Sequence, residues 1–257
     1  ERLFALHRAH VALVPYENID IQLGRPPSID PYASAERIIA GRGGYCYHLN
    51  GAFALLLTEL GYDVSRHVGG VFSRARPAGV TGGHAALTVR VGGGEWFVDV
   101  GLGDALFEPM PLTSGRSRQG PFVYRLEPSP VAPGGWRFWH AANAGSFAGM
   151  DFTAPSVGMD AFADMHDELS TSPSSPFVMV AQVGRRTANG LDFLRGCHLR
   201  TVSASGSDLR ALTSADEWYG VLDEVFDLPL TELDDAVRAA LWDRLWSAHE
   251  RFLASLR

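Results

Sequence analysis

The first quarter of the chain carries apolar residues at helical spacing. Three segments show this pattern: residues 1–14, 33–40 and 45–60. Pro15 ends the first helix because proline lacks a backbone N–H, and Gly61 ends the third because glycine readily adopts the left-handed conformation that follows a helix. Residues 19–21 are expected to form a short extended segment. The pattern therefore predicts a mostly helical N-terminal part.

Strand-like alternation replaces the helical spacing after Gly61. It covers five segments: residues 64–73, 84–91, 96–100, 122–126 and 136–140. Gly92 and Gly93 join the second and third of these and favour a two-residue hairpin turn. Clusters of glycine, proline and serine supply the other turns. The middle of the chain is therefore predicted to be an antiparallel sheet or small barrel.

The C-terminal third mixes the two patterns. Residues 177–183 and 197–204 resemble strands, and the capping-box sequence at residues 214–217 opens a helix. A long amphipathic helix follows from about residue 233 to 256. The order of patterns predicts an α+β chain in three domains: a helical domain over 1–65, an antiparallel β-barrel over 66–170 and an α/β domain over 171–257.

Composition describes an ordinary globular protein, with 46% hydrophobic and 20% charged residues among 257. The net charge of −7 argues against a nucleic-acid partner, which usually meets a basic surface. The longest apolar runs are too short to span a membrane, and the first residues lack a signal-peptide pattern. Two cysteines are too few for a disulfide framework, so reduced thiols and a cytoplasmic location are expected.

Cys46 is the first candidate for chemistry. It follows Arg42-Gly43-Gly44-Tyr45 at the start of a predicted helix. Unpaired backbone N–H groups and the helix dipole favour a negative charge there, and the thiolate is the reactive form of cysteine. A small buried residue is the common alternative for a free cysteine. The setting indicates a nucleophile if the chain also supplies a base.

His84 and Asp99 are the candidate base and orienting carboxylate. They lie on the two arms of the predicted hairpin, where a turn at Gly92 and Gly93 makes His84 face Gly101 and Asp99 its diagonal neighbour. A register shift of one residue would separate them. Asp99 also lies in an apolar strand, where a carboxylate must be exposed or paired. A cysteine nucleophile needs such a base and such an orienting group.

Other reactive side chains are assigned weaker roles. Cys197 lies in a strand pattern and is expected to be structural. His48 is expected to be a pocket or surface residue rather than a second base. The nine histidines lack the Cys-x-x-Cys and His-Glu-x-x-His spacings, so no metal site is predicted.

Four short blocks together resemble the arylamine N-acetyltransferases. They occur in this order: Val14-Pro15-Tyr16-Glu17-Asn18, Arg42-Gly43-Gly44-Tyr45-Cys46, Gly83-His84 and Val98-Asp99-Val100-Gly101-Leu102-Gly103. The resemblance implies a helical first domain, a β-barrel second domain and an α/β third domain that acts as a lid, around a triad core like that of cysteine proteases. It also implies that Cys46 accepts the acyl group, that His84 is the base and that Asp99 orients it.

The same resemblance implies a ping-pong transfer. An acetyl group passes from acetyl-coenzyme A, which is a co-substrate rather than a permanently bound cofactor, to Cys46 and then to an arylamine or arylhydrazine. Arg42 would brace Glu17 as a structural pair. The implied pocket for the acyl group and substrate has six residues: Tyr16, Tyr47, Gly83, Gly101, Leu102 and Gly103.

Three other functions stay open at this point. Relatives of the family are amide synthases that close macrolactams from a polyketide thioester on an acyl carrier protein. Departures from the family pattern at His48, Gly83 and Leu102 are compatible with a wider cleft. Thiol-dependent hydrolysis uses the same triad. A non-catalytic binding protein would instead have an inert, buried Cys46.

Overall fold

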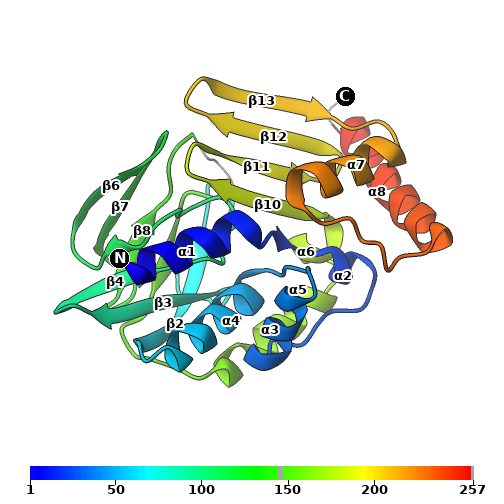
Figure 1. Cartoon of the computed structure of the whole chain (residues 1–257). Coiled ribbons are helices and arrows are strands. Elements are labelled where there is room, and N and C mark those ends of the chain that lie inside the picture. The colour runs from blue at the N-terminus through cyan, green and yellow to red at the C-terminus, as the bar shows by residue number, and fades with distance from the viewer. Residues whose placement is uncertain (144–146, 256–257) are drawn as a thin grey trace.

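The computed structural model describes residues 1–143 and 147–255, which form two antiparallel sheets flanked by helices (Figure 1). The N-terminal helices lie beside the larger sheet in the lower half of the view. The smaller sheet lies above them, and the two C-terminal helices cover its right-hand end. This arrangement confirms the predicted α+β class.

The N-terminal part contains four helices and a short strand. These are α1 (Arg2–Leu13), β1 (Tyr16–Glu17), α2 (Ile19–Gln22), α3 (Pro31–Ile39) and α4 (Cys46–Glu59). Asp30 caps α3 by accepting a hydrogen bond from the Ala33 N–H at 2.9 Å. The apolar face of α4 packs against the larger sheet through Leu49, Phe53 and Leu57.

The extended segment predicted at residues 19–21 is wrong, because these residues belong to α2. The alternation Ile-Asp-Ile suggested a strand with one polar face. All four residues of α2 are instead buried, since Asp20 is paired with arginines and Gln22 donates to the Phe177 carbonyl oxygen at 2.5 Å. Because polar side chains with hydrogen-bonding or charged partners can also be buried, the alternation of polar and apolar residues did not indicate which side chains face solvent.

The larger sheet has eight strands and forms a near-closed barrel. Its strands are β2 (Asp63–Phe72), β3 (His84–Val91), β4 (Gly94–Val98), β5 (Met110–Pro111), β6 (Gly115–Gln119), β7 (Phe122–Pro128), β8 (Trp136–Trp139) and β9 (Gly149–Phe152). They pair in the order β5-β4-β3-β2-β9-β8-β7-β6, always antiparallel. Stacked aromatic rings fill its interior, including Phe97 against Phe152 at 5.2 Å. The predicted barrel is confirmed.

The C-terminal part contains short helices, a second sheet and two longer helices. They are η1 (Met159–Phe162), α5 (Ala163–Thr171), α6 (Pro176–Met179), β10 (Gln182–Thr187), β11 (Gly190–Arg195), β12 (His198–Ser203), β13 (Gly206–Ala211), α7 (Ala215–Phe226) and α8 (Asp235–Ser255). Ser214 caps α7 by accepting from the Glu217 N–H at 3.2 Å, as the capping-box sequence predicts.

The strand predicted over residues 177–183 is wrong for most of its length. Ser175 accepts a hydrogen bond from the Phe177 N–H at 3.2 Å, and Pro176 occupies the first helical position, so a short helix forms there. The strand β10 begins only at Gln182. The local capping signal therefore prevails over the apolar run.

The second sheet joins the two ends of the chain. Its order is β1-β10-β11-β12-β13, so the two residues of β1 form one edge, with Tyr16 paired to Gly184. A segment of the predicted first domain thus lies in the sheet of the predicted third. The domain limits at residues 65 and 170 stay a prediction.

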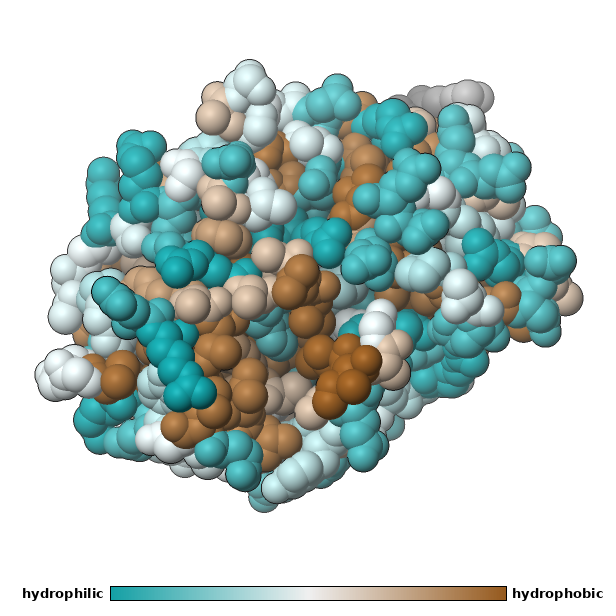
Figure 2. All heavy atoms as spheres, in the orientation of Figure 1, coloured by the Kyte–Doolittle hydropathy of each residue, from teal (hydrophilic) through white to brown (hydrophobic). Residues whose placement is uncertain are grey.

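The surface in the orientation of Figure 1 is uneven in polarity. Figure 2 shows apolar side chains gathered in its lower central part, while mostly polar ones cover its upper right. Leu13 and Ile39, in the N-terminal helices, are exposed large apolar residues. Within residues 1–143 and 147–255, helices of a length and hydropathy suited to crossing a membrane are absent.

Candidate active site

Cys46 is the first residue of α4 and lines a cavity of about 470 Å³. The first hydrogen bond along this helix joins the Leu49 N–H to the Tyr45 carbonyl oxygen at 3.1 Å. The N–H groups of Cys46, Tyr47 and His48 precede that bond and lie at the positive end of the helix dipole. The cavity, called the reaction cavity below, therefore meets the sulfur where negative charge is favoured.

Two glycines allow the chain to reach this position. A Cβ on Gly43 would lie 1.8 Å from the Pro15 carbonyl oxygen, and one on Gly44 would lie 2.6 Å from Cβ of His48. The Gly44 carbonyl oxygen accepts a hydrogen bond from the Glu17 N–H at 2.9 Å. The Arg-Gly-Gly sequence is thus explained by close backbone packing directly before Cys46.

The β3–β4 hairpin brings His84 and Asp99 together. Val91 pairs with Gly94, so Gly92 and Gly93 form a two-residue turn, and both have positive φ, 62° and 77°. His84 Nε2 lies 2.7 Å from Asp99 Oδ2, and both residues are buried. The register expected from the turn is the one the structure has.

Asn50 holds the other oxygen of Asp99. Its Nδ2 donates to Asp99 Oδ1 at 2.9 Å and to the Ala85 carbonyl oxygen at 2.7 Å, while its Oδ1 accepts from the Val100 N–H at 2.9 Å. Sequence reasoning missed Asn50. The available signal was its position four residues after Cys46, which places both on one face of α4.

His84 is held as an imidazolium at neutral pH. Burial opposes the charged ring, but the negative charges of Asp99 and Cys46 and hydrogen bonds to both outweigh it and raise the pKa of His84 to about 10. The ring therefore lies between a carboxylate and a sulfur as a cation. A cation beside the sulfur favours the thiolate form of cysteine.

The structure separates the six predicted pocket residues into two groups. Tyr16, Gly83, Gly101 and Leu102 line the reaction cavity. Tyr47 does not line the cavity. Its side chain is fully buried, and its hydroxyl donates a hydrogen bond to the Gly82 carbonyl oxygen at 2.5 Å. Its ring packs against the rings of Tyr45 and Phe162 and does not line the cavity.

Gly103 is also outside the lining of the reaction cavity. Its φ is +72°, and a Cβ there would lie 2.9 Å from Cγ of Tyr16. Its role is therefore to let the backbone turn closely beside the Tyr16 ring.

Aromatic and cationic side chains that the sequence did not indicate complete the reaction cavity. They include Phe72, Arg76, Phe147, Phe177, Phe193 and Arg195. These residues come from four distant segments, so local patterns could not bring them together. Their rings give the space above Cys46 an apolar wall suited to flat apolar groups.

The predicted brace between Arg42 and Glu17 exists but is the weaker of two contacts. Arg42 Nη2 lies 3.4 Å from Glu17 Oε1, whereas Arg37 Nη2 lies 2.5 Å from the same oxygen. Arg37 also pairs with Asp20 and donates to the Gly43 carbonyl oxygen at 2.6 Å. Arg37, which sequence reasoning missed, is the main brace.

His48 differs from its predicted position. Its side chain is fully buried, with Nε2 3.3 Å from the Pro27 carbonyl oxygen and the ring edge-on to Tyr45 at 4.8 Å. Burial lowers the pKa of His48 to about 3, so the ring is neutral. It is part of the packing beneath the helix start, and not of the surface or the reaction cavity.

Cys197 is buried, and burial raises the pKa of its thiol to about 11. This environment suits a structural thiol better than a nucleophile. Across the part of the chain that the structure describes, no three histidine, cysteine or carboxylate side chains are grouped as metal ligands.

Comparison with known proteins identifies the family. The N-acetyltransferase family model matches residues 1–235. The chain belongs to the arylamine N-acetyltransferase family. The arylamine N-acetyltransferase of Escherichia coli is 37% identical over 129 residues, covering 49% of this chain and 46% of that protein. The chain thus spans about half the length of this curated relative and of the similar Salmonella typhimurium enzyme.

Two further members of the family match most of the chain. Proansamycin X synthase of Amycolatopsis mediterranei is 28% identical, covering 88% of this chain and 89% of that protein. The arylamine N-acetyltransferase of Mycobacterium marinum, solved in complex with CoA, aligns with a TM-score of 0.84 at 26% identity, covering 95% of this chain and 91% of that one. The fold described above is therefore that of the family.

Proposed function

We propose that this protein transfers an acetyl group from acetyl-coenzyme A, through a thioester on Cys46, to the nitrogen of an arylamine or arylhydrazine. The observation that carries the proposal is the buried Asp99–His84 pair, 2.7 Å apart, with His84 and Cys46 both lining the reaction cavity. Membership of the family and the CoA complex of the Mycobacterium marinum relative support the choice of donor.

In the first half-reaction the Cys46 thiolate attacks the thioester carbonyl carbon. A bond forms between that carbon and Sγ, and the bond to the coenzyme A sulfur breaks. His84, an imidazolium beforehand, gives its proton to the departing thiolate and becomes neutral. Backbone N–H groups at the start of α4 are suited to stabilise the oxyanion.

In the second half-reaction the amine nitrogen attacks the acetyl-Cys46 carbonyl carbon. The new C–N bond forms, the C–S bond breaks, and the amine proton passes to His84. This restores the thiolate and the imidazolium. Asp99 keeps the ring oriented through both steps, and the buried position of Cys46, 3% exposed, limits hydrolysis of the thioester by water.

Mass spectrometry of the intact protein tests the proposal. Incubation with acetyl-coenzyme A should add one acetyl group to wild type and to Cys197→Ala, and none to Cys46→Ala. Addition of an arylamine should then remove the acetyl group and yield the amide. Acetylation of Cys46→Ala, or an acetyl-enzyme that no amine discharges, would refute the mechanism.

A second candidate is an amide synthase that joins a polyketide thioester on an acyl carrier protein to an aryl amine. The similarity to proansamycin X synthase supports it, because the match covers 89% of that protein. This function predicts no acetylation by acetyl-coenzyme A despite rapid alkylation of Cys46 by iodoacetamide. Slow alkylation would instead indicate a non-catalytic binding protein. Either enzyme would act in the cytoplasm, as the reduced cysteines suggest.

A further inference from the structure

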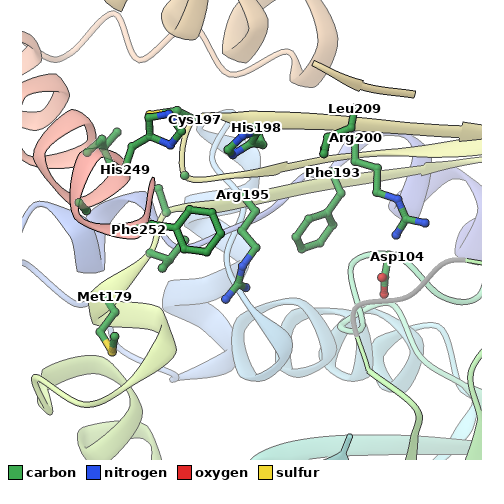
Figure 3. Close-up of a pocket in the computed structure, with 15 residues that line it drawn as sticks. Asp104, Met179, Phe193, Arg195, Cys197, His198, Arg200, Leu209, His249 and Phe252 are labelled. Carbon is green, nitrogen blue, oxygen red and sulfur yellow. The ribbon is translucent and has the colours of Figure 1, made fainter. Parts of the chain in front are cut away.

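A short turn, residues 101–104, forms part of the wall of the reaction cavity and part of the wall of a second cavity. Gly101 and Leu102 line the reaction cavity, while Asp104 lines the second, which has a volume of about 560 Å³ and extends to β11, β12 and α8 (Figure 3). Phe193 and Arg195 line both cavities. The conformation of residues 101–104 therefore sets the shape of the space beside Cys46.

Asp104 is held by a second buried histidine–carboxylate pair. His140 Nε2 lies 3.0 Å from Asp104 Oδ1, with the two residues 8% and 1% exposed. The other ring nitrogen, Nδ1, lies 3.0 Å from the Ala141 carbonyl oxygen. A buried carboxylate is costly unless it is paired, so this contact fixes the side chain of Asp104.

His140 also contacts a second residue that lines the reaction cavity. Its ring packs edge-on against Phe147 with centroids 4.3 Å apart, and Phe147 lines the reaction cavity. Its backbone N–H donates to the Ala148 carbonyl oxygen at 3.1 Å. One side chain thus contacts both the turn bearing Leu102 and an aromatic ring that lines the same cavity.

The ends of the turn are held independently of this pair. At the start, the Gly101 N–H donates to Asp99 Oδ1 at 2.9 Å. After the turn, the Ala105 carbonyl oxygen accepts from the Tyr124 hydroxyl at 2.6 Å and from Arg186 Nε at 2.8 Å. Loss of the histidine contact should release the middle of the turn and leave the Asp99–His84 pair intact.

We propose that Asp104 and His140 are positioning residues that fix the wall against which the amine acceptor binds. The inference rests on the proposed function, because it concerns the second half-reaction. After the donor thiol has left, the acetyl group on Cys46 is small, and the incoming amine packs against the side chains that remain, Leu102 and Phe147 among them. A displaced wall therefore weakens amine binding more than it slows acetylation.

Substitution of His140 by leucine and by glutamine tests this. His140→Leu removes the donor and should raise the KM for 4-methoxyaniline about tenfold, with kcat and the rate of Cys46 acetylation nearly unchanged. His140→Gln keeps an N–H near the position of Nε2 and should restore most of the affinity. Asp104→Ala should raise KM similarly, and the double variant should show little further loss because both remove one contact.

Asp151→Asn is the matched control. Asp151 is a fully buried carboxylate of the same barrel, paired with Arg137 Nη2 at 2.8 Å and outside the lining of both cavities. It should lower Tm without changing the KM for the amine. If His140→Leu leaves KM unchanged, if glutamine fails to rescue, or if acetylation slows as much as amine transfer, the positioning role is overturned.

Equilibrium binding of 4-methoxyaniline to the resting protein separates this inference from the proposed function. Failure of wild type to become acetylated would refute the acetyl transfer alone. Weaker amine binding to His140→Leu than to wild type and to Asp151→Asn would still support the positioning role. Equal binding to all three would overturn it.

Discussion

Replacement of Asp99 by asparagine removes the charge that keeps His84 protonated. The rise of the His84 pKa from 6.5 to about 10 corresponds to roughly 5 kcal/mol in favour of the imidazolium. Burial alone acts in the opposite direction, and the ring is 2% exposed. The Asp99→Asn variant should therefore have a His84 pKa below 6.5.

The pH dependence follows from the sign of this shift. Because the folded pKa is raised, the stability that His84 contributes is fully present below pH 6.5 and is lost as the pH rises through about 10. In wild type the imidazolium should persist across the neutral range. In Asp99→Asn it should be lost before neutrality, so the thiolate loses its adjacent cation.

Two measurements examine this prediction. NMR titration of the His84 ring should show a midpoint near pH 10 in wild type and below 6.5 in the variant. The rate of Cys46 alkylation by iodoacetamide at pH 7 should fall by a factor of ten or more. Asp151→Asn controls for loss of a buried carboxylate elsewhere in the barrel. Unchanged titration in Asp99→Asn would refute the reasoning, because Asp99 would then not set the charge of the ring.

Three further predictions concern the stability of the fold. Gly43→Ala should destabilise the fold by several kcal/mol, because the new Cβ would lie 1.8 Å from a carbonyl oxygen; thermal unfolding measures this. Arg37→Met should lower the free energy of unfolding by about 3 kcal/mol or more, and Arg42→Met should lower it by less. The reason is that Arg37 makes the shorter contact to buried Glu17, and urea titration of both variants measures the difference. Gly220→Ala in α7, where a Cβ meets open space, should raise that free energy by about 0.5–1 kcal/mol, and a decrease would contradict the packing described.

The hairpin geometry was predictable because its determinants are local. Gly92 and Gly93 specify a two-residue turn, the turn specifies the register, and the register brings His84 toward Asp99. The helix start at Cys46 was likewise readable from the adjacent glycines. In both places a few neighbouring residues determine the backbone conformation, so the conformation can be predicted from a single sequence.

The missed features depend on partners far away in the chain. Arg37 has no local sequence signal for a brace, because its partners Glu17 and Asp20 lie about 20 residues earlier in the chain. Asn50 has none either, because its partner Asp99 lies 49 residues later. The prediction for the short segment α2 was wrong for a related reason. Because all of its residues are buried, its polar and apolar positions do not alternate in a way that distinguishes a helix from a strand.

The pairing of β1 with β10 has a consequence for the biosynthesis of the protein. Asn18 Oδ1 accepts a hydrogen bond from the Gln182 N–H at 2.7 Å, across 164 positions of sequence, and the neighbouring Tyr16 bridges to Gly44 just before Cys46. The segment that ends at Cys46 therefore gains the support of the second sheet only after residue 182 has been synthesised. Until then, the nascent chain carries Cys46 with the edge strand β1 unpaired to β10.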